Sequence, residues 1–100
     1  MTSFYQRRIS LKKKKNEKIV TFLGRITLQK GPEYFIEAAH LVLKKMNNVR
    51  FVMAGSGDMM HEMIARVAEL GISDKFHFTG FLKGTHVHQM FKLTDVFVMP

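Results

Sequence analysis

The chain has 100 residues, the size of one small domain or of a piece of a larger one. Its apolar share of 46% supports a buried core, and its nine phenylalanines argue against disorder. Cysteine is absent, which excludes disulfide bonds, thiolate metal sites and a cysteine nucleophile and fits a cytoplasmic protein. No apolar run approaches the length of a membrane span, and no signal-peptide core follows the basic first residues.

The formal net charge of +8 is concentrated at the start of the chain. Residues 1–18 hold seven basic side chains against one acid, whereas residues 19–100 hold nine basic and seven acidic ones. We therefore predict a basic linker or tail over residues 1–17 and a folded domain over residues 18–100. The alternative is that the tail makes a polybasic contact, with a membrane surface in preference to nucleic acid, which would make the protein membrane-peripheral.

Short apolar runs alternate with longer segments from residue 18 onward. The runs are rich in β-branched and aromatic residues, and the first three are followed by glycine, which is typical of buried strands. Strands are therefore predicted at residues 19–23, 49–54, 76–79 and 96–99.

The three segments between these strands have apolar residues at helical spacing. The first helix opens at Gly31-Pro32, where proline suits the first turn, and ends near Lys45. The second ends at about Leu70, before Gly71, and the third is short. The side chains predicted to face inward are Phe35, Ile36, Ala39, Val42, Leu43 and Met46 on the first helix, Met60, Met63, Ile64, Val67 and Leu70 on the second, and Val87, Met90 and Phe91 on the third.

This β-α-β-α-β-α-β order predicts an α/β, Rossmann-like fold. Strands that are apolar throughout indicate a parallel sheet with helices on both faces, and right-handed crossovers give the strand order 3-2-1-4. The fourth strand would lie at an uncovered edge of the sheet. We therefore also expect self-association through residues 96–99.

The loop over residues 24–31 is the most informative candidate site. It places Arg25 and Lys30 between the end of a strand and the start of a helix. A guanidinium, an ammonium and the free N–H groups of a helix N-terminus together suit a diphosphate. The alternative is that both cations are solvated and that the glycines only allow tight turns.

Four motifs in order carry a resemblance to a known family. They are Phe22-Leu23-Gly24-Arg25 with Gln29-Lys30-Gly31, then Val52–Gly57, Phe78–Leu82 and Asp95–Pro100. Together they resemble the front part of the C-terminal, nucleotide-sugar-binding domain of retaining GT-B glycosyltransferases (glycosyltransferase group 1, family 4, glycogen-synthase-like).

The resemblance implies a transferase that moves a sugar from a nucleotide-sugar donor, with uridine or another nucleoside diphosphate as the leaving group. It implies that Arg25 and Lys30 hold the diphosphate and stabilise its departure, with no metal ion or cofactor. The donor-binding residues that it implies are Gly24, Gly31, Gly55, Gly57, Gly80, Phe81 and Leu82. The family's acidic E-x7-E element and its N-terminal acceptor domain are missing, so we expect no transfer by a chain of this length alone.

Two other functions remain open from the sequence. One is a nucleotide-sugar epimerase of the GT-B fold, and the other is a non-catalytic Rossmann-like binding module with a basic tail. Gly55-Ser56-Gly57 begins a dinucleotide fingerprint, but Met60 occupies the third glycine position. His86 and His88 have the spacing of a ligand pair, yet no third ligand is in view, so we expect surface histidines and no metal site.

Overall fold

The computed structural model describes residues 13–100, so most of the predicted basic tail lies outside the described residues. The strands and helices lie in nearly the predicted places, and two 3-10 turns, which were not predicted, lie between them. The elements are β1 (Lys18–Leu23), η1 (Leu28–Lys30), α2 (Pro32–Leu43), β2 (Val49–Ala54), α3 (Met60–Glu69), η2 (Ser73–Lys75), β3 (Phe76–Gly80), α4 (Thr85–Leu93) and β4 (Val96–Val98).

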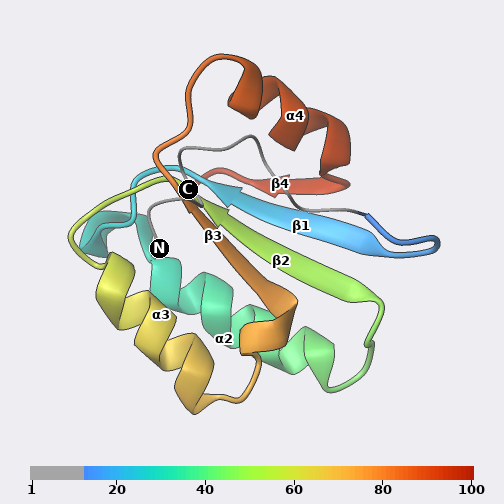
Figure 1. Cartoon of the computed structure of the whole chain (residues 1–100). Helices are drawn as coiled ribbons and strands as arrows, with labels where there is room; N and C mark the ends of the chain where they lie inside the picture. The colour runs from blue at the N-terminus through green and yellow to red at the C-terminus, as the bar shows by residue number, and fades with distance from the viewer. Residues whose placement is uncertain (1–12) are drawn as a thin grey trace.

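The four strands form one parallel sheet in the order β3-β2-β1-β4. This confirms the predicted 3-2-1-4 order. Helices α2 and α3 cover one face of the sheet and α4 covers the other (Figure 1). Since all strands are parallel, their carboxyl ends lie at one end of the sheet and their amino ends at the other.

Alternating residues of the strands fill two cores, one on each face. The larger core lies under α2 and α3 and contains an aromatic cluster. There Phe35 of α2 meets Phe51 and Phe76 edge-on, with ring centroids 5.8 and 6.1 Å away. The smaller core lies under α4 and centres on Met90. Strands buried on both faces explain why their sequences are apolar throughout.

The predicted inward faces of the helices were too wide. Val42, Met46, Ile64 and Phe91 are 36%, 45%, 42% and 46% exposed. Met46 lies beyond the end of α2 at Leu43, and the other three stand at the borders of their apolar stripes. A sheet of four strands covers only the centre of each stripe, so the border residues stay in contact with water.

The described residues before β1 are attached to the domain by charged hydrogen bonds. Glu17 is 7% exposed, and its carboxylate accepts bonds of 2.7 and 3.0 Å from the guanidinium of Arg50 in β2. Lys13 forms an ion pair of 2.7 Å with Asp95, next to β4. The last part of the predicted tail therefore contacts both β2 and the α4–β4 connection.

Candidate functional site

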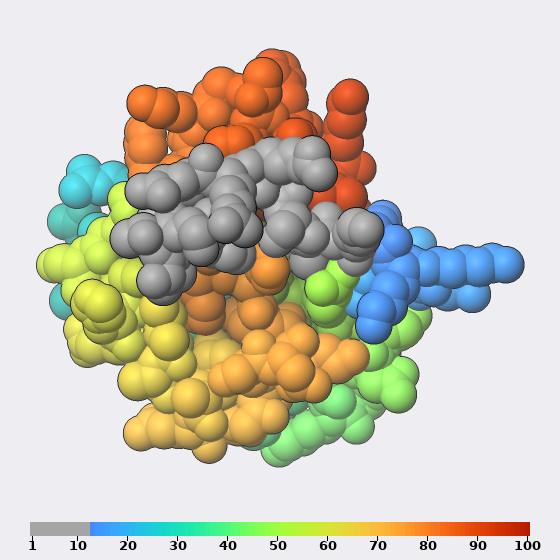
Figure 2. Space-filling model, viewed as in Figure 1, coloured from blue at the N-terminus to red at the C-terminus, as the bar shows by residue number. Residues whose placement is uncertain are grey.

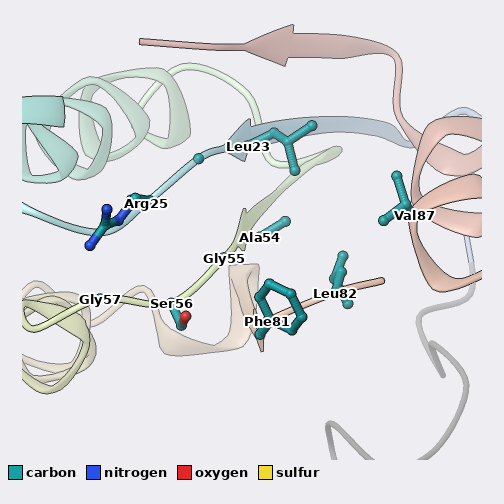
Figure 3. A pocket seen from close by; sticks show the side chains of 10 residues that line it. Leu23, Arg25, Ala54, Gly55, Ser56, Gly57, Phe81, Leu82 and Val87 are labelled. Atoms are coloured by element: carbon teal, nitrogen blue, oxygen red, sulfur yellow. The ribbon is translucent and has the colours of Figure 1, made fainter. Parts of the chain in front are cut away.

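A cavity of about 400 Å³ opens at the carboxyl ends of β1, β2 and β3 (Figure 3). The loops that leave these three strands and the first turn of α4 supply its walls. The lining residues are Leu23, Gly24, Arg25, Ala54, Gly55, Ser56, Gly57, Phe81, Leu82 and Val87. This is the end of an open parallel sheet at which α/β proteins bind their ligands.

The cavity has an apolar side and a polar side. Figure 3 shows Phe81, Leu82 and Val87 gathered on one side and Arg25 on the other, beyond the Gly55–Gly57 turn. Phe81 is 68% exposed, so its ring is available to a ligand. Among the described residues, Arg25 is the only charged one in the lining. The arrangement suits an elongated molecule with a flat apolar part and an anionic part.

The main chain around Arg25 is held by hydrogen bonds between loops. These bonds connect the loop after β1 to the loop after β2, and the loop after β2 to the end of β3. They run from Gly24 N–H to Ala54 C=O (3.1 Å), from Ile26 N–H to Ser56 C=O (3.0 Å), from Met59 N–H to Ile26 C=O (3.1 Å) and from Gly55 N–H to Gly80 C=O (3.1 Å). Because bonded residues lie on both sides of Arg25 and the Ile26 side chain is fully buried, the backbone at the rim of the cavity is fixed.

Gly55 and Gly57 allow these loops to approach each other. A Cβ atom at Gly55 would collide with the carbonyl oxygen of Gly24, and one at Gly57 would collide with the backbone of Ile26. Gly55 also has φ of 145°, which side chains disfavour. The resemblance implied donor-binding roles for both glycines, and the structure adds a packing reason for them.

Lys30 and Gly31 lie outside the lining of the cavity. Lys30 ends η1, and Gly31 follows in the left-handed conformation, with φ of 63°. That conformation closes η1 through a bond of 3.2 Å from Gly31 N–H to Leu28 C=O and leads directly into α2 at Pro32. Lys30 itself is half-buried and lies just before the N-terminus of α2. Free N–H groups at a helix N-terminus favour an anion.

The structure brings six of the nine predicted site residues together. Those that line the cavity are Gly24, Arg25, Gly55, Gly57, Phe81 and Leu82. Gly80, like Lys30 and Gly31, is outside the lining, and its carbonyl holds the Gly55 loop.

Four lining residues were not predicted as site residues. Leu23 and Ala54 are the last residues of β1 and β2, so the rule about strand ends would have found them. Ser56 stands between two predicted glycines. Val87 carries no local signal, because it has the spacing of a residue that faces the core.

Residues 13–100 contain neither a candidate metal site nor a candidate membrane span. In that part of the chain, no three His, Cys, Asp or Glu side chains gather closely enough to hold a metal ion. The helices described there are also too short or too polar to span a bilayer.

The chain matches the model of the family described as glycosyl transferases group 1 over residues 4–100, and it belongs to that family. It is 40% identical over 85 residues to an uncharacterized glycosyltransferase of Methanocaldococcus jannaschii. The aligned segment covers 85% of this chain and 22% of that protein. It is 33% identical over 82 residues to the alpha-D-kanosaminyltransferase of Streptomyces kanamyceticus, covering 82% and 21%. The chain thus spans about a fifth of the length of these relatives.

Solved structures of glycosyltransferases share the fold. The C-terminal domain of the group 1 protein LpcC from Francisella tularensis superposes with a TM-score of 0.71 at 27% identity, covering 80% of this chain and 44% of that one. A TarM variant from S. aureus, crystallised with UDP among its ligands, gives 0.74 at 25% identity, covering 81% and 16%. The fold is therefore the Rossmann-like α/β arrangement of GT-B glycosyltransferases.

Proposed function

We propose that this chain carries the diphosphate-binding part of the nucleotide-sugar donor site of a retaining glycosyltransferase. The observation that carries the proposal is the position of Arg25, which is the only charged group among the described residues lining the cavity and faces an apolar opposite side. A nucleoside diphosphate has the matching parts, an apolar base and an anionic diphosphate. The relatives and structures named above are glycosyltransferases, which supports this function over an epimerase or a non-catalytic module.

The proposed chemistry assigns the departing diphosphate to two cations. The Arg25 guanidinium would bind it through paired N–H donors at the rim of the cavity. Lys30 would reach it on a flexible four-carbon stem from the turn before α2, whose N-terminal N–H groups add positive potential. Charge that develops on the leaving group as the sugar bond breaks would then be stabilised from two directions.

Gly24, Gly31, Gly55 and Gly57 would let the main chain come close to the diphosphate. Phe81 and Leu82 would lie against the base, on the apolar side of the cavity. UDP is the first ligand to test, since the similar TarM structure contains it.

Calorimetric titration of the chain with UDP, ADP and GDP tests this assignment. Two charge-assisted contacts of roughly 1.5–3 kcal/mol each, reduced by the cost of ordering the ligand, give an expected dissociation constant of about 1 mM. Arg25→Ala and Lys30→Ala should each weaken binding roughly 10-fold or more. Lys83→Ala removes an exposed lysine outside the lining and serves as the control. If neither substitution changes binding, both assigned roles are wrong.

The transfer reaction is tested on a longer protein that contains this domain. Donor turnover should fall with Arg25→Ala and Lys30→Ala, and NMR of the first product should show the anomeric configuration of the donor. An inverted product would refute retention while leaving the diphosphate site intact. We expect the 100-residue chain alone to bind the donor and to transfer no sugar.

A further inference from the structure

The end of the sheet opposite the cavity is strongly basic. The segments that enter the four strands meet there, together with the last turns of α2 and α4. We call this end the basic pole, and its basic residues are Lys13, Lys14, Lys15, Lys18, Lys44, Lys45, Arg50, Lys75 and Lys92.

The whole positive charge excess of the described residues lies at the basic pole. Its nine basic residues face three acids (Glu17, Asp74 and Asp95), which is a formal +6. The remainder of residues 13–100 has four basic and five acidic residues, which is −1. The sequence had assigned the excess to the leading segment, but folding joins the end of that segment to lysines from three other connections. The excess therefore forms a surface as well as a tail.

Most lysines of the pole are exposed, and two of its three acids are already paired with other residues. Glu17 pairs with Arg50, and Asp95 pairs with Lys13. Lys14, Lys15, Lys18, Lys44 and Lys45 are exposed. Figure 2 shows the residues before β1, in blue, projecting beside the green surface that includes the α2–β2 connection.

Exposed aliphatic side chains accompany these lysines at the end of α2. Leu41 is 62% exposed, Val42 36% and Met46 45%. The connection that follows α2 also forms a shallow hollow of about 420 Å³, lined by residues 43–48 and including Lys44 and Lys45. Cations and aliphatic groups thus share one surface.

We propose that the basic pole docks on an anionic phospholipid membrane. Lysine is a compact charge on a flexible stem, and several lysines near an anionic bilayer each add to the attraction. Leucine and methionine gain by entering the boundary between headgroups and acyl chains, a gain that a nucleic-acid backbone does not offer. The one arginine of the pole is engaged by Glu17, and the exposed apolar groups at the end of α2 are not aromatic, so neither is suited to stacking on bases.

This docking goes beyond the proposed function and does not depend on it. The pole and the cavity lie at opposite ends of the sheet, so a docked molecule keeps the mouth of the cavity away from the lipid. Loss of UDP binding and loss of membrane binding are therefore separate outcomes.

Cosedimentation of the 100-residue chain with vesicles provides the test. The chain should bind phosphatidylcholine vesicles that contain phosphatidylglycerol, should not bind pure phosphatidylcholine, and should be released by salt. Lys44→Gln/Lys45→Gln should weaken binding roughly 10- to 30-fold. Arg66→Gln/Lys83→Gln removes the same charge outside the pole and should have little effect. Deleting residues 1–12 should leave most of the binding.

Substitution of one exposed aliphatic residue distinguishes a membrane-binding surface from a nucleic-acid-binding surface. Leu41→Ser should weaken vesicle binding without changing the retention of duplex DNA. The proposal is overturned if residues 1–12 account for all vesicle binding, or if the control pair weakens it as much as the Lys44/Lys45 pair. Tighter binding to DNA than to anionic vesicles, with no effect of Leu41→Ser, would make the pole a nucleic-acid surface. Thermal unfolding of each variant verifies that it is folded.

Discussion

Asp95 and Ile19 are joined by two hydrogen bonds. The N–H of Asp95 donates to the carbonyl of Ile19 at 2.8 Å, and the Asp95 carboxylate accepts the Ile19 N–H at 2.8 Å. This pair lies immediately before the point where β1 and β4 begin to pair, with Val20 opposite Val96. Because β4 contributes only three residues to the sheet, the pair is a large part of what attaches it.

Replacing Asp95 by alanine should loosen β4. One hydrogen bond to a charged acceptor and the ion pair to Lys13 are lost, so the free energy of unfolding should fall by about 1–2 kcal/mol. Asp95→Asn keeps an acceptor for Ile19 and should recover part of this loss. Urea denaturation of the two variants measures the difference, and hydrogen exchange should show the faster opening confined to β4. Equal exchange throughout the sheet would contradict the local role.

Acid should destabilise the fold through Glu17. Burial alone raises the pKa of Glu17, but the hydrogen bonds from Arg50 and the Lys14 N–H outweigh it, so the pKa lies below its ordinary value of 4.5. The stabilisation is therefore complete above about pH 4.5 and is lost as the pH falls through the lower pKa of the folded state. Glu17→Gln should lower stability at neutral pH and flatten this acid limb. Denaturation measured from pH 7 downward tests the effect, and an acid limb as steep in Glu17→Gln as in the unaltered chain would contradict it.

Gly57→Ala should disrupt the contact between the first two loops. Its new Cβ would collide with the backbone of Ile26, which has little room to move, and the expected loss is about 2 kcal/mol. Gly24→Ala is the matched control, because its Cβ would meet only side-chain atoms of Pro100 and Phe22, none closer than 3.8 Å. It should change stability by less than about 0.5 kcal/mol. Equal unfolding midpoints for the two variants would show that the loops adapt and that the packing reason for Gly57 is wrong.

Phe81→Ala should weaken nucleotide binding without weakening the fold. The ring is 68% exposed, so its removal creates no cavity in the core. If the base stacks on it, affinity for UDP should fall by about 1–3 kcal/mol. Tyr34→Ala removes another exposed ring, 76% exposed on α2 and outside the cavity lining, and should leave affinity unchanged. Calorimetry and thermal melts of both variants decide the matter, and a loss of stability without loss of affinity would remove Phe81 from the site.

The sequence alone determined the strands, the helices, their order and the loop that contains Arg25. Each of these has a local signal, such as the apolar run that ends at Gly24 or the proline after Gly31, and right-handed crossovers then restrict the sheet to few arrangements. The borders of helix faces were less predictable. Ile64 has the spacing of a core residue, but only the extent of the layer beneath α3 decides that it is 42% exposed.

Tertiary structure alone decided which residues share a surface. Val87 lines the cavity because α4 lies on the face of the sheet next to the ends of β1 and β2. These strand ends are far from Val87 in the sequence. Gly57 is constrained by the carbonyl of Ile26, thirty-one positions earlier, which no local pattern can express. Lys13 and Lys44 belong to one basic pole because parallel strands place every incoming connection at the same end of the sheet.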